Sequence, residues 1–373
     1  MTKEYHQWLL ELTGTPTASG REQRVIAWVR RWVSKRKHLA ISADRFGNLT
    51  IKRRGARSAR PIYITAHMDH PAFVVSRVIG PREVEAEFRG GVADEYFAGS
   101  PVVLHHADLP PQRGVVAELV KARDEEGSQV VIVRSEGEAP AAVGDVMTWD
   151  VGPARIEGDR LVAPGCDDLA GVVGALAGLA AVTDRKKGAP NRKRQSDVRV
   201  MLTRAEEGGF IGAIAACRAK LIPAKARLVL LENSRSFADS PIGGGPIVRV
   251  GDRTSTFDPD LTYRLSSIAG DLAKADPSFK WQRKLMPGGT CESSVYQAYG
   301  YTSACLCLPL GNYHNQNFDT GKIDAETISL TDFDGLVRLV VEAAMKLDDS
   351  QHAPSLRTRL EALYKRNRHM LAE

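Results

Sequence analysis

The chain of 373 residues is 43% hydrophobic and 26% charged, which are ordinary proportions for a globular protein and exclude long disordered tracts. No run of apolar residues approaches the roughly 18 that a membrane-spanning helix needs, so we expect no membrane partner. The excess of lysine and arginine (51) over aspartate and glutamate (45) is mild, and basic clusters such as Arg30-Arg31 lack interleaved aromatic residues, so we expect no nucleic-acid partner.

The first part of the chain has an alternating α/β pattern. Apolar residues recur at helical spacing over residues 3–13 and 21–36, and strand-like runs follow at 39–43 and 48–53. The apolar run at 61–66 ends in polar residues, which is typical of a buried strand whose carboxyl end carries a site. The N-terminus has no apolar segment followed by a small-residue cleavage site, so we expect no secretory signal.

The pattern changes between residues 72 and 160. Short β-rich segments separated by glycine and proline predict a compact all-β module there, of the small-barrel type. After residue 160 the α/β pattern returns. The expected helices are 169–183, 209–220, 328–347 and 354–371, and the expected strands are 197–202, 226–231 and 302–306.

We therefore predict an α/β fold: a three-layer α/β/α domain with a mixed sheet, interrupted by an inserted barrel-like β domain. The predicted α/β domain comprises residues 1–71 and 161–350, the insert comprises 72–160, and 351–373 form a C-terminal helix.

The five cysteines are odd in number and include no Cys-x-x-Cys pair, which argues against a disulfide framework and against a structural zinc site. A cytoplasmic location is therefore expected. Cys305 and Cys307 alternate along an apolar strand, and we expect them to be buried as small hydrophobic residues.

Five short motifs carry residues suited to catalysis, and nearly all of them follow an apolar strand or precede a helix. They are His67-Met68-Asp69, Asp167-Asp168-Leu169-Ala170-Gly171, Glu206-Glu207-Gly208, Glu232-Asn233 and Asn312-Tyr313-His314. Each has an ordinary structural explanation when taken singly, such as a helix N-cap for an aspartate pair. Together they carry more weight, because the carboxyl ends of strands meet at one edge of an α/β sheet.

Two histidines and several carboxylates gathered at that edge would form a mixed nitrogen and oxygen ligand set. Such a set suits zinc, cobalt or manganese, and a shared carboxylate would hold two metals close together. The side chains of Glu206 and Glu207 diverge because the two residues are neighbours. One of them can therefore bind metal while the other faces the reacting water.

In this order, the motifs resemble the co-catalytic metallopeptidases, and among these the tetrahedral (TET) or glutamyl aminopeptidase family. The long interval between His67 and Asp167 is similar to the position of that family's inserted domain. The carboxypeptidase-like branch instead places its extra domain in the later interval, which here is 232–314. Gly243-Gly244-Gly245-Pro246 and Gly288-Gly289-Thr290 are similar to glycine signatures of the family.

The resemblance implies a centre of two divalent metal ions, with Zn²⁺ as the first choice and Co²⁺ or Mn²⁺ as alternatives. It implies that Asp167 bridges the metals and that the other four ligands serve one metal each; these are His67, Glu207, Glu232 and His314. Glu206 would be the general base, and Asp69 would accept a hydrogen bond from His67 and so orient its ring.

Among the departures from the family pattern are the fourth motif, the residue after Gly-Gly-Thr, Leu169 in place of an arginine, and Asn315-Gln316-Asn317 in place of Ser-Pro-x-Glu. The family usually has aspartate at the fourth motif, where we prefer Glu232 over Asn233 as the ligand. Cys291 stands where the family has an aspartate after Gly-Gly-Thr, and its role is open.

The implied function is an aminopeptidase that hydrolyses N-terminal residues from peptide substrates with a metal-activated water, and that forms a homo-oligomer of between two and twelve subunits. Two alternatives stay open. One is a non-peptide amidohydrolase, such as a deacylase, or a carboxypeptidase-like enzyme on the same scaffold. The other is a catalytically inactive homologue with a binding or assembly role.

Overall fold

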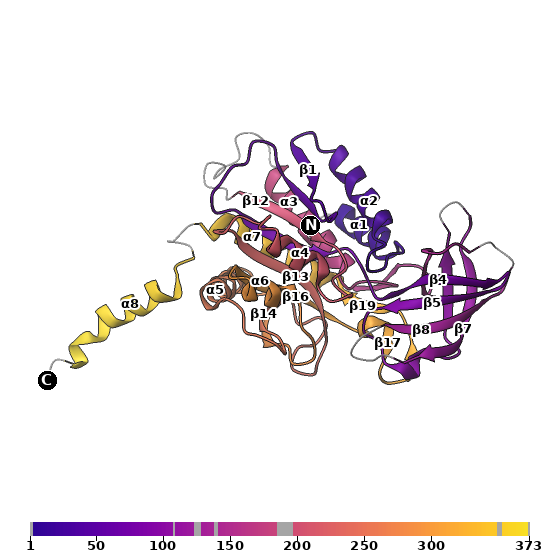
Figure 1. The fold of residues 1–373 in the computed structure, drawn as a ribbon. Helices are drawn as coiled ribbons and strands as arrows, with labels where there is room; N and C mark the ends of the chain where they lie inside the picture. The colour runs from indigo at the N-terminus through magenta and orange to yellow at the C-terminus, as the bar shows by residue number, and fades with distance from the viewer. Residues whose placement is uncertain are drawn as a thin grey trace.

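The computed structural model describes residues 3–106, 109–122, 128–137, 141–184, 197–348 and 353–371. It contains a larger α/β domain and a β-barrel that lies to one side of it, at the right of Figure 1. The barrel is formed by one stretch of chain, which begins after β3 (Ile62–His67) and ends with β9 (Val146–Trp149).

An eight-stranded mixed sheet forms the centre of the α/β domain, in the order β1-β2-β12-β3-β13-β16-β14-β15. The four strands β12, β3, β13 and β16 are parallel, and they are buried along nearly their whole length, which explains their continuous apolar sequences. The remaining bounds are β1 Leu39–Ala43, β2 Leu49–Arg53, β12 Val198–Thr203, β13 Arg227–Arg235, β14 Ile247–Gly251, β15 Gln282–Leu285 and β16 Thr302–Leu310.

Alternate residues of the central strands enter different cores on the two faces of the sheet. Ile62 and Ile64 of β3 pack with α1, α2, α3, α5 and α7, whereas Tyr63 packs with α4 and α6. The domain therefore has three layers. The helices are α1 Lys3–Thr13, α2 Gln23–Ser34, α3 Leu169–Thr183, α4 Ile211–Arg218, α5 Pro259–Ala275, α6 Glu292–Ala298 and α7 Leu330–Lys346.

Six antiparallel strands close the barrel in the order β4-β5-β8-β7-β6-β9. β5 alternates glutamates with buried residues, so one of its faces packs inward. The barrel core contains a cluster of aromatic rings from Phe73, Phe88, Phe97 and Trp149. The bounds are β4 Ala72–Gly80, β5 Glu83–Arg89, β6 Pro101–His105, β7 Gln112–Lys121 and β8 Gln129–Ser135.

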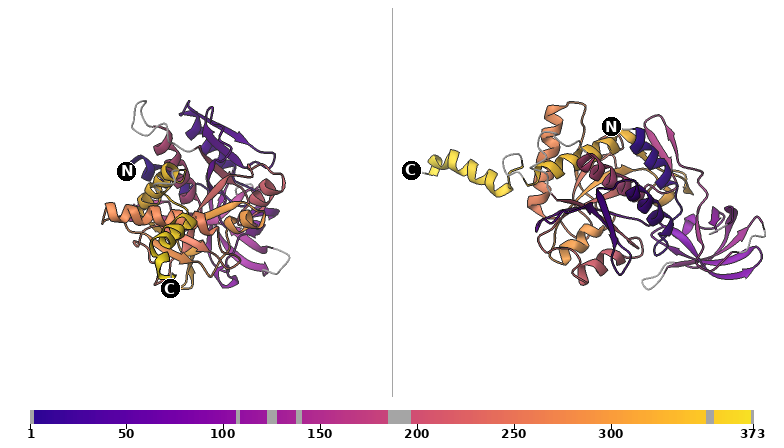
Figure 2. Two further views of the ribbon diagram at one scale, coloured as in Figure 1. Left: turned by 90° about the vertical axis from the view of Figure 1, so that its left-hand side faces the viewer. Right: turned by 90° about the horizontal axis from the view of Figure 1, so that it is seen from above.

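Smaller elements complete the fold. β10 (Arg155–Glu157) and β11 (Arg160–Ala163) lie outside the barrel and pair with β19 (Glu326–Ser329), while β17 (Gln316–Asn317) pairs with β18 (Lys322–Ile323). α8 (Leu356–Asn367) has no buried residue and projects away from the body in Figures 1 and 2. Within the described ranges, no helix combines the length and the apolar character that crossing a bilayer requires. The predicted fold class, an α/β domain with a mixed sheet and a barrel-like insert, is confirmed.

Candidate metal centre

Side chains suited to metal binding gather at the carboxyl edge of the parallel strands. His67 is the last residue of β3 and lies opposite Thr203, the last residue of β12, after which the chain carries Glu206 and Glu207. Glu232 lies near the carboxyl end of β13, the other neighbour of β3. Adjacent parallel strands thus bring together residues that are distant in sequence.

Two further residues reach the same edge from connecting segments. Asp167 lies between β11 and α3, and its peptide bond to Asp168 is cis. His314 lies in a short 3₁₀ turn after β16, where its φ of 55° is in the left-handed region.

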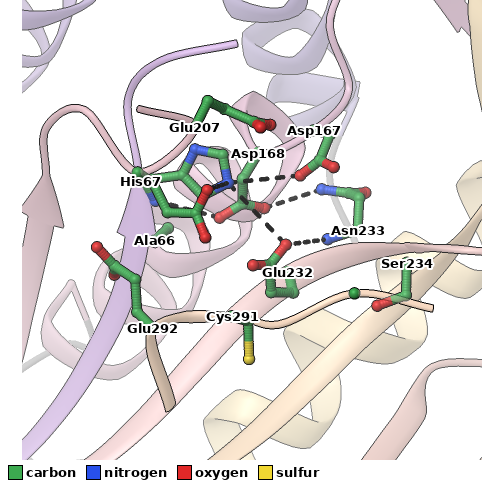
Figure 3. A network of polar contacts seen from close by, with 12 residues as sticks. Ala66, His67, Asp167, Asp168, Glu207, Glu232, Asn233, Ser234, Cys291 and Glu292 are labelled. Atoms are coloured by element: carbon green, nitrogen blue, oxygen red, sulfur yellow. Dashed lines mark hydrogen bonds and ion pairs between the residues drawn. The ribbon is translucent and has the colours of Figure 1, made fainter. Parts of the chain in front are cut away.

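Asp167 stands between the two histidines. Its Oδ1 atom is 3.5 Å from His67 Nε2, and its Oδ2 atom is 3.5 Å from His314 Nε2. On the outer sides, Glu232 Oε2 is 4.0 Å from His67 Nε2, and Glu207 Oε1 is 3.1 Å from His314 Nε2. Figure 3 shows His67, Asp167 and Glu232 pointing toward one another. The arrangement is a central carboxylate with one imidazole and one glutamate on each side.

Glu206 also faces this centre, with Oε2 at 4.0 Å from His67 Nε2. Donor atoms of His67, Glu206 and Glu232 lie within 4.8 Å of one another, as do those of His67, Asp167 and Glu207. The structure therefore brings together all of the side chains that the sequence singled out as ligands or base.

The charges of the centre fit bound cations. Asp167 Oδ1 and His314 Nε2 are buried, and neither makes a hydrogen bond of regular geometry with the described residues, although Glu207 Oε1 lies 3.1 Å from His314 Nε2. Burial raises the pKa of the Glu206 and Glu232 carboxyls well above their usual range, because their charged forms are desolvated in a cluster of acidic groups. A divalent cation would bind the unbonded nitrogen and oxygen atoms and would offset the desolvation of the charged carboxylates. A ligand set of imidazole and carboxylate suits zinc, cobalt or manganese.

Asp69 has a wider structural role than the sequence suggested. His67 Nδ1 is 3.1 Å from the backbone oxygen of Asp69 and 3.5 Å from its carboxylate. That carboxylate accepts the backbone N–H groups of Glu206 and Glu207, each at 3.0 Å, and the hydroxyl of Ser19 at 2.5 Å. Asp69 therefore fixes the loop that carries both glutamates as well as lying beside His67.

The structure also explains the spacing of the Asp-Asp-x-x-Gly motif. Asp168 accepts the backbone N–H of His67 at 3.2 Å and the side-chain amide of Asn233 at 2.8 Å, so it links β3, α3 and β13 (Figure 3). A Cβ atom at position 171 would lie 2.0 Å from Asp168 Oδ1. Gly171 is therefore needed to leave room for the aspartate.

The sequence did not identify Glu326 as part of the site. This fully buried carboxylate accepts the backbone N–H groups of Cys166 at 2.6 Å, Asp167 at 2.9 Å and His314 at 2.9 Å. It therefore joins the two segments that carry Asp167 and His314. Its neighbours are backbone groups, so no sequence motif indicates it.

Cys291 packs with the two strand cysteines, Cys305 and Cys307. All three are fully buried in one apolar cluster, which agrees with the expectation for Cys305 and Cys307. Glu292, which follows Cys291 and is drawn in Figure 3, is also buried. Burial raises its pKa to about 7.

The centre opens into a cavity of about 1040 Å³ between the two domains. The barrel contributes Glu87 and Arg89 to its wall, and the end of β13 and the segment after it contribute Arg235 and Phe237. The loop after β5 also contacts the site, because His314 Nδ1 is 2.7 Å from the backbone oxygen of Gly91.

The chain was compared with protein families, with curated protein sequences and with solved structures. A family model of the M42 glutamyl aminopeptidases matches residues 47–330. No curated protein sequence matches the chain. The TET1 peptidase of Pyrococcus horikoshii, described as assembling into a tetrahedron or a large octahedral shell, is 20% identical, with a TM-score of 0.74 over 92% of this chain and 99% of its own.

Two other archaeal structures are similar in fold. A TET aminopeptidase from a marine sediment archaeon of the Thaumarchaeota is 18% identical, with a TM-score of 0.76 over 94% of this chain and 99% of its own. An aminopeptidase from Desulfurococcus kamchatkensis is 20% identical, with a TM-score of 0.74 over 92% of this chain and 95% of its own.

Proposed function

Because this chain belongs to the M42 glutamyl aminopeptidase family and is a peptidase, we propose that it removes N-terminal residues from peptides by means of two divalent cations, with Zn²⁺ as the first choice. The observation that carries this proposal is the position of Asp167, whose two carboxylate oxygens each lie 3.5 Å from a different histidine. A bridging carboxylate with separate ligands on each side is the arrangement that a two-metal site requires.

The distances suggest which residues would hold each cation. His67 and Glu232 lie on one side of Asp167, and His314 and Glu207 lie on the other. Bound there, the cations would polarise a carbonyl oxygen and lower the pKa of water from 15.7 to about 7.

Glu206 is the candidate general base. It is buried at the centre and lies beside His67, yet its side chain is not needed for either ligand set. It would accept a proton from the attacking water and return it to the leaving amine. Asp69 would keep Glu206 in place through the backbone N–H bonds of the loop.

Removal and replacement of metal tests the proposal. Exhaustive chelation should abolish hydrolysis of aminoacyl anilides, and addition of zinc or cobalt should restore it. A matched set of N-acyl amino acids distinguishes an aminopeptidase from a deacylase. Activity that survives complete removal of metal would contradict the proposal, as would a preference for N-acyl amino acids.

We also propose that the protein is a homo-oligomer. The TET1 peptidase can assemble into a tetrahedron or a large octahedral shell. The barrel of this chain exposes large apolar side chains that a partner subunit would cover. They include Val78, Ile79, Val115, Val120 and Val143. Light scattering should report a mass above that of one chain, and a strictly monomeric species would contradict the proposal.

A cytoplasmic location is supported by the five cysteines, which are all free.

A further inference from the structure

Arg235 is a cation in the wall of the cavity that the site chemistry does not use. It is the last residue of β13, three positions after Glu232, and its side chain is exposed. It lines the same cavity as His67 and Glu206. At roughly 3.3 Å per strand residue, its backbone lies about 10 Å along the strand from that of Glu232.

Aromatic rings hold the Arg235 guanidinium in place. Its central carbon lies 3.8 Å from the ring centroid of Phe318 and 5.7 Å from that of Phe237. Phe318 follows β17 and is 46% exposed. Its ring meets that of Tyr96 of the barrel edge-on, with 6.5 Å between the ring centroids. Stacking restricts the guanidinium while leaving its N–H donors free to bind an anion.

No carboxylate among the described residues pairs with Arg235, whereas the charges of two nearby cations are neutralised. Arg89 pairs with Glu87 at 2.9 Å, and Lys284 pairs with Asp239. Across the part of the chain that the structure describes, Arg235 makes no ion pair with a carboxylate. A planar guanidinium of this kind binds a carboxylate through two parallel hydrogen bonds.

We propose that Arg235, stacked on Phe318, forms a subsite for a carboxylate of the peptide substrate, at one to three residues from the scissile bond. This proposal rests on the proposed aminopeptidase function. A peptide spans about 3.3–3.6 Å per residue, so the C-terminal carboxylate of a short peptide falls within reach of the Arg235 side chain. An acidic side chain at the same distance offers the same chemistry.

Matched substrates distinguish these two sources. The probes are Leu-Gly-Gly as the free acid, Leu-Gly-Gly amide, and Leu-Gly-Asp amide, whose carboxylate is on a side chain. We expect the native enzyme to prefer one carboxylate-bearing peptide over Leu-Gly-Gly amide by about ten-fold in kcat/KM, chiefly through KM. Arg235→Met should remove this preference, and Arg235→Lys should retain part of it.

Lys284→Met is the matched control, because it removes a nearby cation whose charge Asp239 already neutralises. It should leave the ratio between the acid and the amide unchanged. The proposal is overturned if Arg235→Met slows the acid and the amide by the same factor. It is also overturned if the native enzyme favours neither carboxylate-bearing peptide.

Failure of the subsite can be distinguished from failure of the proposed function. Leucine anilide carries no carboxylate, so its hydrolysis reports the aminopeptidase reaction alone. Should no substrate be cleaved, calorimetric titration of the three peptides into the zinc-loaded protein still measures the subsite. Tighter binding of a carboxylate-bearing peptide that Arg235→Met abolishes would support the subsite, and equal or absent binding of all three would refute it.

Discussion

His314 Nδ1 lies 2.7 Å from the backbone oxygen of Gly91, so the inserted barrel contacts a candidate metal ligand of the other domain. A carbonyl can only accept, so Nδ1 donates to it, and in the neutral ring Nε2 then carries no proton and faces Asp167 and Glu207. A hydrogen bond of this kind fixes the tautomer and the ring orientation of a ligating histidine. The barrel is therefore expected to affect catalysis as well as assembly.

We predict that Gly90→Ala weakens metal binding. Gly90 has a φ of 145°, and a Cβ atom there would lie 2.5 Å from Pro71 Cβ. The loop must therefore shift, and the Gly91 carbonyl should move away from His314. Metal affinity and anilide hydrolysis should fall by about ten- to a hundred-fold, as is typical when the partner of a ligating histidine is lost.

Gly99→Ala provides the control for this prediction. Gly99 also has a positive φ, of 80°, but a Cβ atom there would have no neighbour within 4 Å. It should share the backbone strain of the first variant without displacing the loop near His314. Zinc titration followed by mass spectrometry measures the metal affinity of both variants. Equal affinities of Gly90→Ala and Gly99→Ala would argue against a role for Gly91.

The two adjacent glutamates should respond differently to the loss of charge. Glu206→Gln should keep the metal content and slow turnover by about 10²–10⁴-fold, because the proposed general base is lost. Glu207→Gln should instead reduce the metal content, because Glu207 lies 3.1 Å from His314 Nε2. Elemental analysis measures the metal content of each variant, and single-turnover kinetics measures its rate of hydrolysis. Metal loss in Glu206→Gln would mean that the roles of the pair are reversed.

The sequence predicted part of the candidate site well because two of its motifs lie at the carboxyl ends of apolar strands. These are the motifs of His67 and Glu232, and the parallel sheet places both at one edge. It could not predict Glu326 or the contribution of Gly91, since these act through backbone N–H and carbonyl groups that leave no residue pattern. Contacts of this type become visible only when the loops are placed in space.

Glu22 is another residue that only the structure connects to the site. It is fully buried, and its carboxylate accepts the backbone N–H of Ala205 at 3.0 Å and the Arg204 side chain at 2.7 Å. Ala205 has a φ of 51°, in the left-handed region that is unfavourable for alanine, and it immediately precedes Glu206. Glu22 thus stabilises a strained turn beside the proposed base.

We predict that Glu22→Gln lowers the free energy of unfolding by about 3 kcal/mol, because it breaks a buried ion pair with Arg204. Ala205→Gly in the same background should recover part of this loss, since glycine adopts the turn without strain. Urea denaturation measures both effects. If Ala205→Gly restores nothing, the strain at Ala205 is not what Glu22 supports.

The barrel should show its own dependence on pH through His105. Burial, followed by the charge of Arg24, lowers the pKa of His105 to about 4, and its Nε2 is 2.9 Å from the hydroxyl of Thr148. The folded state therefore holds this ring neutral, whereas the unfolded chain binds a proton below about pH 6.5. The stability from the neutral ring is complete above pH 6.5 and is lost as the pH falls toward 4.

Between pH 7.5 and pH 5, this single group should lower the free energy of unfolding by about 2 kcal/mol. His105→Gln cannot bind the proton, so its stability should fall less than that of the native protein over the same interval. Urea denaturation of both proteins at the two pH values isolates the effect, because every other titrating group is common to them. Parallel losses of stability would show that His105 is not held neutral by the fold.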